Sequence, residues 1–109
     1  MFKDLFKSNA VTVTDAVAMV ADGNALLVDV RTRQEWKTGH APVARHISLA
    51  SLENQMGRIP KDRTVLAICA TGSRSARATA MLRGVGYEAR NVKGGMRAWA
   101  RAGLEVTKK

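Results

Sequence analysis

Val65-Leu66-Ala67-Ile68-Cys69-Ala70-Thr71-Gly72-Ser73-Arg74-Ser75 is the stretch from which the architecture of this chain can be predicted. Its first four residues form a short apolar run typical of a buried strand, and the Ala-rich segment after the loop predicts a helix. Cys69, the only cysteine, therefore falls at a strand-to-helix turn. Successive backbone N–H groups and a helix N-terminus converge on an anion at such a turn, which favours a nucleophilic thiolate there.

Strand and helix signals alternate along the rest of the chain. Such alternation favours a parallel sheet covered by helices on both faces. Ligands bind sheets of this kind beyond the carboxyl ends of the strands, and Cys69, Asp29 and Val92 fall at such ends. The expected elements are strand 11–13, helix 16–20 capped by Thr14 and Asp15, strand 25–28, helix 34–36, strand 46–48, helical turn 51–56, strand 65–68, helix 74–83, strand 87–92 and helix 96–103.

The length and composition of the chain bound its class. Its 109 residues suit a single domain, residues 1–109, with loose ends at 1–10 and 105–109. No apolar stretch reaches the roughly 20 residues needed to span a bilayer, and residues 1–7 lack the apolar region of a signal peptide. A lone cysteine forms no internal disulfide, so nothing favours an oxidising compartment, and the cytoplasm of a bacterium is the expected location.

The formal net charge of +9 arises mostly from arginine and favours an anionic partner. Such partners range from a small oxyanion to an acidic protein surface or a nucleic acid. Nucleic acid is not expected, because the basic residues are scattered, only five residues are aromatic and no recognised binding motif accompanies them. The charge favours a small anionic substrate, and a solvated basic surface without a partner is the other interpretation.

The loop can activate Cys69 by itself. A free thiol has a pKa of roughly 8.5, so lowering it to ~6.5 takes about 2.7 kcal/mol of additional thiolate stabilisation. A partly buried helix N-terminus supplies up to ~2 kcal/mol, and a hydrogen bond to a charged acceptor adds roughly 1.5–3 kcal/mol. Activation therefore needs no histidine base.

Neighbouring residues distinguish a functional cysteine from a structural one. Free cysteine is among the most buried residue types, so a packing role is the plain alternative. Arg74 and Arg77, however, occupy the first turns of the expected helix, where the helix dipole disfavours cations. A local rule broken in this way is expected at functional sites, and Gly72 permits a left-handed or close-approach backbone where a side chain would intrude. These features favour function.

Three segments of the chain form signatures. They are Leu26-Leu27-Val28-Asp29-Val30-Arg31 with Glu35-Trp36 and Gly39-His40-Ala41-Pro42, then the loop Cys69-Ala70-Thr71-Gly72-Ser73-Arg74-Ser75, then Gly86-Tyr87 with Val92-Lys93-Gly94-Gly95-Met96-Arg97-Ala98-Trp99. In this order and with these gaps they resemble the rhodanese superfamily over essentially the whole chain. The resemblance implies an α/β fold with a five-stranded parallel sheet flanked by helices on both faces.

The resemblance also implies a thiosulfate sulfurtransferase that uses no cofactor. The Cys69 thiolate would attack the outer sulfur of thiosulfate or another sulfane donor, and the persulfide would pass its sulfur to cyanide or a thiol. Arg74 would hold the loop in shape, add positive potential and help to draw in a dianionic donor. The loop residues whose backbone N–H groups would cradle the persulfide are Ala70, Thr71, Gly72, Ser73, Arg74 and Ser75.

Asp29 and Arg31 are expected to support the site rather than to react. Asp29 either accepts hydrogen bonds from loop N–H groups or pairs with Arg31 or Arg74. Two histidines and one cysteine are too few ligands for zinc, so no metal is expected. The expected core positions are Trp36 and Trp99, and Gly94-Gly95 is expected to let a loop pack closely near the active site.

Four other functions fit parts of the pattern. A persulfide carrier receives sulfur from one protein and delivers it to another, and a basic surface suits docking to an acidic partner. A regulatory interaction module shares the fold, but such modules often lose the nucleophile that this chain keeps. A cysteine phosphatase is disfavoured, because four residues rather than five separate Cys69 from Arg74. A redox sensor would lack a resolving cysteine.

Overall fold

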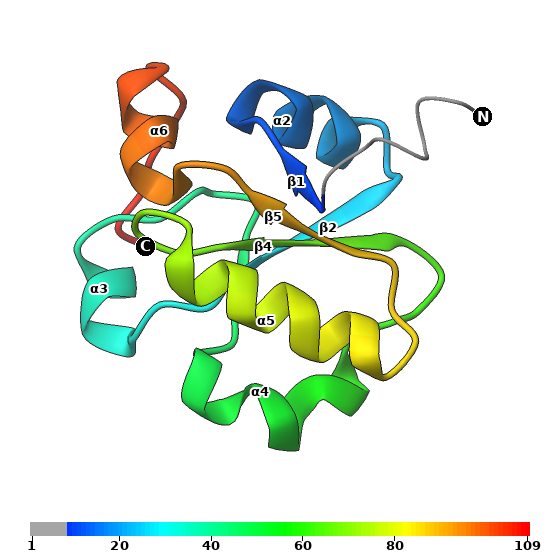
Figure 1. Cartoon of the computed structure of the whole chain (residues 1–109). Helices are drawn as coiled ribbons and strands as arrows, with labels where there is room; N and C mark the ends of the chain where they lie inside the picture. Colours follow the sequence, from blue (N-terminus) through cyan, green and yellow to red (C-terminus); the bar gives the residue numbers. More distant parts are fainter. Residues whose placement is uncertain (1–8) are drawn as a thin grey trace.

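The computed structural model describes residues 9–109, and these form a parallel sheet with helices on both faces (Figure 1). The five strands lie in the order β1-β5-β4-β2-β3, which confirms the expected architecture. The elements are β1 (Ala10–Val11), α2 (Val13–Ala21), β2 (Ala25–Asp29), α3 (Arg33–Lys37), β3 (Arg45–His46), α4 (Leu49–Gln55), the short 3-10 helix η1 (Met56–Arg58), β4 (Thr64–Ile68), α5 (Ser73–Gly84), β5 (Ala89–Val92) and α6 (Gly95–Arg101).

The central strand β4 pairs with β2 on one side and with β5 on the other. All five residues of β2 pair with β4, from Ala25 opposite Thr64 to Asp29 opposite Ile68. Because the strands are parallel, their carboxyl ends meet at one edge of the sheet. The residues that follow β2, β4 and β5 are therefore brought together at that edge.

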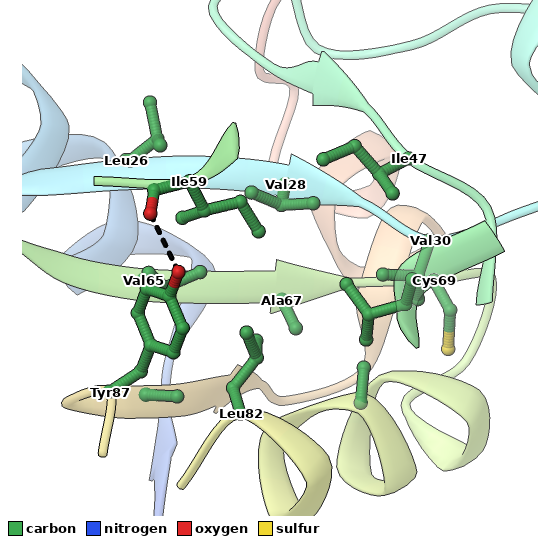
Figure 2. Packing of buried hydrophobic residues seen from close by; sticks show 13 residues of the cluster. Leu26, Val28, Val30, Ile47, Ile59, Val65, Ala67, Cys69, Leu82 and Tyr87 are labelled. Atoms are coloured by element: carbon green, nitrogen blue, oxygen red, sulfur yellow. Dashed lines mark hydrogen bonds between the residues drawn. The ribbon is translucent and has the colours of Figure 1, made fainter. Parts of the chain in front are cut away.

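Each face of the sheet has its own hydrophobic cluster, because successive side chains of a strand point to opposite faces. In β2, Leu26 and Val28 face α4 and α5, whereas Ala25 and Leu27 face α2 and α6. Figure 2 shows part of the first cluster, with Cys69 at the end of β4. That cluster is Leu26, Val28, Val30, Ile47, Leu52, Ile59, Val65, Ala67, Cys69, Ala78, Leu82, Tyr87 and Ala89.

Two expected boundaries near the N-terminus are wrong. The strand expected at 11–13 ends at Val11, and helix α2 is capped by Thr12 rather than by Thr14 and Asp15. Thr12 has an extended backbone, and its Oγ1 accepts a hydrogen bond from the Asp15 N–H at 3.0 Å. Asp15 instead lies in the first turn of α2, where its negative charge interacts favourably with the positive end of the helix dipole.

Later boundaries also differ from expectation, and the last helix, expected over 96–103, is Gly95–Arg101. The helix expected from Ser51 begins at Leu49, and the strand expected at 46–48 is Arg45–His46. The last strand begins at Ala89 rather than at 87, because Tyr87 packs into the hydrophobic cluster before the strand begins. The buried Tyr87 hydroxyl contacts the carbonyl oxygens of Met56 at 2.7 Å and Ile59 at 2.6 Å, the second contact being drawn in Figure 2.

The ends of the described chain are more ordered than expected. The loose end expected at 1–10 lies mostly outside the described residues, but Ala10 pairs with Asn91 in the sheet. The expected loose end at 105–109 is wrong at Thr107, which exchanges two backbone hydrogen bonds of 2.8 Å with His40. Among residues 9–109, no helix has the length and apolar character needed to cross a membrane.

The two tryptophans have different surroundings. Trp99 of α6 is buried in the second hydrophobic cluster, on the α2 and α6 face of the sheet, as expected. Trp36 is only partly buried, so the expected core position is wrong. Its ring stacks on His40, with ring centroids 3.5 Å apart, and its second stacking partner is His46.

Candidate active site

Cys69 directly follows β4, and its sulfur contacts hydrogen-bond donors from the loop and from α5. The Gly72 N–H donates to Sγ at 3.1 Å, and the Ser75 Oγ lies 3.2 Å from Sγ. Helix α5 begins at Ser73 because Gly72 adopts a left-handed conformation, with φ of 113°, that turns the chain into the helix. The loop therefore folds back over the sulfur within six residues.

Helix α6 holds the other side of this loop. The Met96 N–H donates to the Cys69 carbonyl at 2.7 Å, and the Arg97 N–H donates to the Ala70 carbonyl at 3.0 Å. A Cβ on Gly95 would collide with the Cys69 carbonyl oxygen, so this close approach requires glycine. Gly94-Gly95 was expected to let a loop pack closely near the active site. Gly95 is the residue of this pair that packs against the backbone of Cys69 and Ala70. With the loop carbonyls bound to α6, the loop N–H groups are left to face the sulfur.

The ionisation of Cys69 reflects two opposing effects. Burial raises the pKa of the thiol, because Cys69 has no exposed surface. Hydrogen bonds from the Ser75 hydroxyl and from the backbone N–H groups of Ser75, Gly72 and Thr71 lower that pKa, and together they outweigh burial. Cys69 is thus as buried as a structural cysteine, but its sulfur has polar partners that packing alone does not require.

Arg74 is bound more tightly than the sequence suggested. Its Nη1 and Nη2 donate to the two carboxylate oxygens of Glu35, at 2.7 and 2.9 Å. These hydrogen bonds are the largest cause that lowers the pKa of Glu35 to about 2 and that raises the pKa of Arg74. Part of the Arg74 charge is therefore neutralised by a residue of α3. The attraction between Arg74 and an ionised Cys69 remains.

Glu35 is a site residue to which the sequence analysis assigned no role beyond its place in the first signature. It also closes a capping box at the start of α3, where Thr32 N–H donates to its Oε1 and Thr32 Oγ1 accepts from the Glu35 N–H. The sequence Thr32-Arg33-Gln34-Glu35 contains the capping pattern. No local pattern indicates that the same carboxylate also binds Arg74, which lies 39 positions away.

Asp29 pairs with Arg31 and not with Arg74. The Arg31 side chain donates to both carboxylate oxygens, with Nη2 at 2.8 Å from Oδ2, and the Arg31 N–H donates to Oδ1. Arg31 also donates to the Gly39 carbonyl at 2.8 Å. Both side chains are buried, so the pair fixes the segment after β2 beside the site. Within residues 9–109, neither residue forms a hydrogen bond with the sulfur.

Asn91 of β5 is a site residue that sequence reasoning missed. Its Oδ1 lies 2.5 Å from the Ser75 Oγ, and its Nδ2 donates to the Gly72 carbonyl at 3.1 Å. The only signal in the sequence was a polar amide side chain within a short strand, and this does not indicate that the amide contacts Ser75 and Gly72. Parallel pairing places Asn91 opposite Ala67 of β4, close to the Cys69 loop.

A groove of about 560 Å³ opens beside Arg74. Its apolar residues include Val30, Leu49 and Met81, and its cationic residues are Arg33, Arg74 and Arg77. Arg33 and Arg77 are exposed. The groove therefore offers positive charge to an anion that approaches the amino end of α5.

Fold and site together define a class: parallel α/β proteins with a cysteine at the carboxyl edge of the sheet, in a strand-to-helix loop whose backbone N–H groups donate to its sulfur. The family model described as Rhodanese-like domain matches residues 12–102, and the chain belongs to this family. A sulfurtransferase of Allochromatium vinosum is 42% identical over 84 residues, covering 76% of this chain and 78% of that protein.

Two further proteins illustrate the range of similarity. A tRNA sulfurtransferase of Desulfurococcus amylolyticus is 36% identical over 86 residues, which cover 79% of this chain but only 17% of that protein. The crystal structure of a rhodanese-related protein from Thermoplasma volcanium matches with a TM-score of 0.85 and 25% identity, covering 92% of this chain and 98% of that chain. Sulfurtransferase-named relatives thus support a sulfurtransferase of the rhodanese-like family.

Proposed function

We propose that this protein is a thiosulfate-type sulfurtransferase that carries sulfane sulfur on Cys69 as a persulfide. The observation that carries the proposal is a single sulfur with the Gly72 N–H at 3.1 Å and the Ser75 hydroxyl at 3.2 Å. These donors stabilise an anion on sulfur, and the thiolate is the nucleophilic form of cysteine. Ala70, Thr71 and Ser73 complete the loop that would surround the terminal sulfur.

The proposed reaction has two displacement steps. The Cys69 thiolate attacks the outer sulfur of thiosulfate, a new S–S bond forms, and the S–S bond of thiosulfate breaks with its electron pair leaving on sulfite. A cyanide ion or a thiolate then attacks the terminal sulfur of the persulfide. The Cys69–sulfur bond breaks, and Cys69 leaves as a thiolate that is ready for another donor.

The charged residues around the groove support an anionic donor. Arg33 and Arg77 are exposed beside it and Arg74 lies at its edge, so a dianion is attracted toward the loop. Arg74 itself is a loop-shaping residue in this proposal, because its guanidinium binds Glu35 through two hydrogen bonds. Asp29 and Arg31 support the neighbouring segment.

Intact-protein mass spectrometry tests this function. Incubation with thiosulfate should add about one sulfur mass per chain, because the reaction stops at the persulfide when no acceptor is present. Cyanide should remove the added mass, and the matched variant Cys69→Ala should never gain it. A wild-type protein that gains no sulfur from thiosulfate or from any other sulfane donor would disprove the enzymatic proposal.

A persulfide carrier is the second candidate, and the net charge of +9 favours it. An acidic protein partner would dock on the basic surface, and the exposed groove residues Arg33 and Arg77 would contribute positive charge to it. Transfer from a persulfidated donor protein should then be much faster than transfer from thiosulfate and should slow as salt is added. If transfer from the donor protein and transfer from thiosulfate had equal rates that did not depend on salt, the carrier proposal would be contradicted and the reaction with thiosulfate would be favoured.

A further inference from the structure

The Ser75 hydroxyl has two neighbours that need its single proton. Its Oγ lies 3.2 Å from Cys69 Sγ and 2.5 Å from Asn91 Oδ1. A hydroxyl group carries one hydrogen, so Ser75 donates to one of these acceptors at a time. Ser75 and Cys69 are fully buried, so water does not replace the Ser75 hydroxyl at the sulfur, whereas Asn91 is partly buried.

The amide of Asn91 is oriented by a second hydrogen bond. Its Nδ2 donates to the Gly72 carbonyl at 3.1 Å, so the opposite side of the amide, Oδ1, faces Ser75 as an acceptor. Asn91 comes from β5, and the Lys93 N–H bonded to Val11 helps to fix that strand against β1. The acceptor is therefore carried by the sheet, and the Gly72 carbonyl of the loop fixes which side of the amide faces Ser75.

We infer that Asn91 is a positioning residue that competes with the Cys69 thiolate for the Ser75 proton. When Cys69 is a thiol, its S–H donates to Ser75 Oγ and the Ser75 O–H donates to Asn91 Oδ1. When Cys69 is ionised, the Ser75 O–H turns to the sulfur, and Asn91 Oδ1 loses that donor. Asn91 thus favours the protonated thiol and limits how easily Cys69 ionises.

Other charged groups near the loop stay the same when Asn91 is replaced. On α5 the nearest is Arg74, which is paired with Glu35 of α3. At the end of β2, Asp29 and Arg31 pair with each other. Further titratable groups on adjoining segments include Arg77 and Arg83 of α5, His46 of β3, Arg90 of β5, which pairs with Glu88, Lys93 after β5 and Arg97 of α6.

The test is the pH dependence of Cys69 alkylation by iodoacetamide in four proteins: wild type, Asn91→Leu, Ser75→Ala and the double variant. Asn91→Leu preserves side-chain size but has no acceptor, so alkylation below the wild-type pKa should be roughly fivefold faster. In the Ser75→Ala protein the same replacement should change nothing, because no hydroxyl proton remains to be released. Asn91→Ala provides a second variant if leucine destabilises the fold.

Two results would overturn the inference. One is slower or unchanged alkylation in both the Asn91→Leu and Asn91→Ala proteins, and the other is an equal change with and without the Ser75 hydroxyl. Thr79→Val is the matched control, because it removes a hydroxyl that donates to the Ser75 carbonyl at 2.8 Å and leaves the Ser75 hydroxyl in place. The inference rests on the proposed function only for its catalytic consequence. Alkylation requires no sulfur transfer, so a failed persulfide assay would not be confused with a failure here.

Discussion

Cys69 combines complete burial with hydrogen bonding to its sulfur. Burial alone would favour the neutral thiol, because an ion loses its hydration inside the protein. The Gly72 N–H and the Ser75 hydroxyl replace that hydration with fixed donors. The balance lowers the pKa of the thiol, although no histidine contributes to it. The reactive form of the side chain is therefore stabilised by its own loop and by the first turn of α5.

The variant Ser75→Ala should make Cys69 less acidic. It removes one hydrogen bond to the thiolate, which is worth about 1.5 kcal/mol at the weak end of charged hydrogen bonds, so the pKa should rise by roughly one pH unit. The rate of alkylation measured against pH checks this result. Ser73→Ala is the control, because Ser73 is exposed at the start of the same helix. Equal pKa values for both variants would show that the Ser75 hydroxyl has no special role.

Helices α3 and α5 are connected through Glu35 and Arg74, which are 39 positions apart in sequence. Glu35 completes the first turn of α3 and also binds Arg74 in the first turn of α5. One carboxylate thus stabilises a helix terminus and orients the arginine beside the cysteine loop. It also offsets the unfavourable position of a cation near the amino end of α5.

The Glu35–Arg74 pair should contribute to stability in a defined pH range. The pKa of Glu35 is lowered from 4.5 to about 2 in the folded protein, so its contribution is fully present above pH 4.5 and is lost as pH falls through about 2. Glu35→Gln should remove this dependence. The cost above pH 4.5 should not exceed about 1 kcal/mol, because both side chains are 35% exposed.

Urea denaturation measured between pH 6 and pH 2 tests that expectation. The difference in the free energy of unfolding between wild type and Glu35→Gln should shrink as the pH falls. Glu53→Gln, at an exposed position of α4, is the control. A difference that stays constant down to pH 2 would show that the ion pair does not supply it.

The whole molecule builds its site where three strand ends and two helix starts meet. Parallel pairing brings the ends of β2, β4 and β5 to one edge of the sheet. Helix α5 then supplies donors to the sulfur, and α6 binds the carbonyls of the same loop from the opposite side. The site consequently depends on how closely α6 approaches the end of β4.

Replacing Gly95 by alanine tests this close approach. Gly95 has φ of 57°, and an added Cβ would lie 2.6 Å from the Ala70 carbonyl carbon. Left-handed strain and steric overlap should together lower the free energy of unfolding by about 2–5 kcal/mol. Persulfide formation should also slow, because the loop carbonyls would be pushed away from α6.

Gly103→Ala separates left-handed strain from steric overlap as causes of the lost stability. Gly103 also has a positive φ, of 73°, but an added Cβ would meet nothing within 4 Å. Denaturation should show a cost of about 1–2 kcal/mol from left-handed strain alone, with persulfide formation unchanged. If both variants were equally destabilised, steric contact at Gly95 would not matter.

Local features of the site and fold were predictable from the sequence. The apolar run 65–68, the loop and the Ala-rich segment correctly placed Cys69 between a strand and a helix. Of the two backbone conformations expected to require Gly72, left-handed or close-approach, the left-handed one is confirmed. The cap of α2 was not predictable in the same way, because Thr12 and Thr14 are both good caps. The pairing of β1 with β5 ends the strand at Val11 and leaves Thr12 to cap the helix.

The amino-acid sequence by itself determined the alternating elements, the parallel sheet and the position of the lone cysteine, because these follow from side-chain periodicity and from turn residues a few positions apart. Only the tertiary structure decided that Glu35 binds Arg74 and that Asn91 contacts Ser75. Those partners lie 39 and 16 positions apart. Their contact depends on strand register and helix packing, which place side chains together without any local pattern that marks the pair.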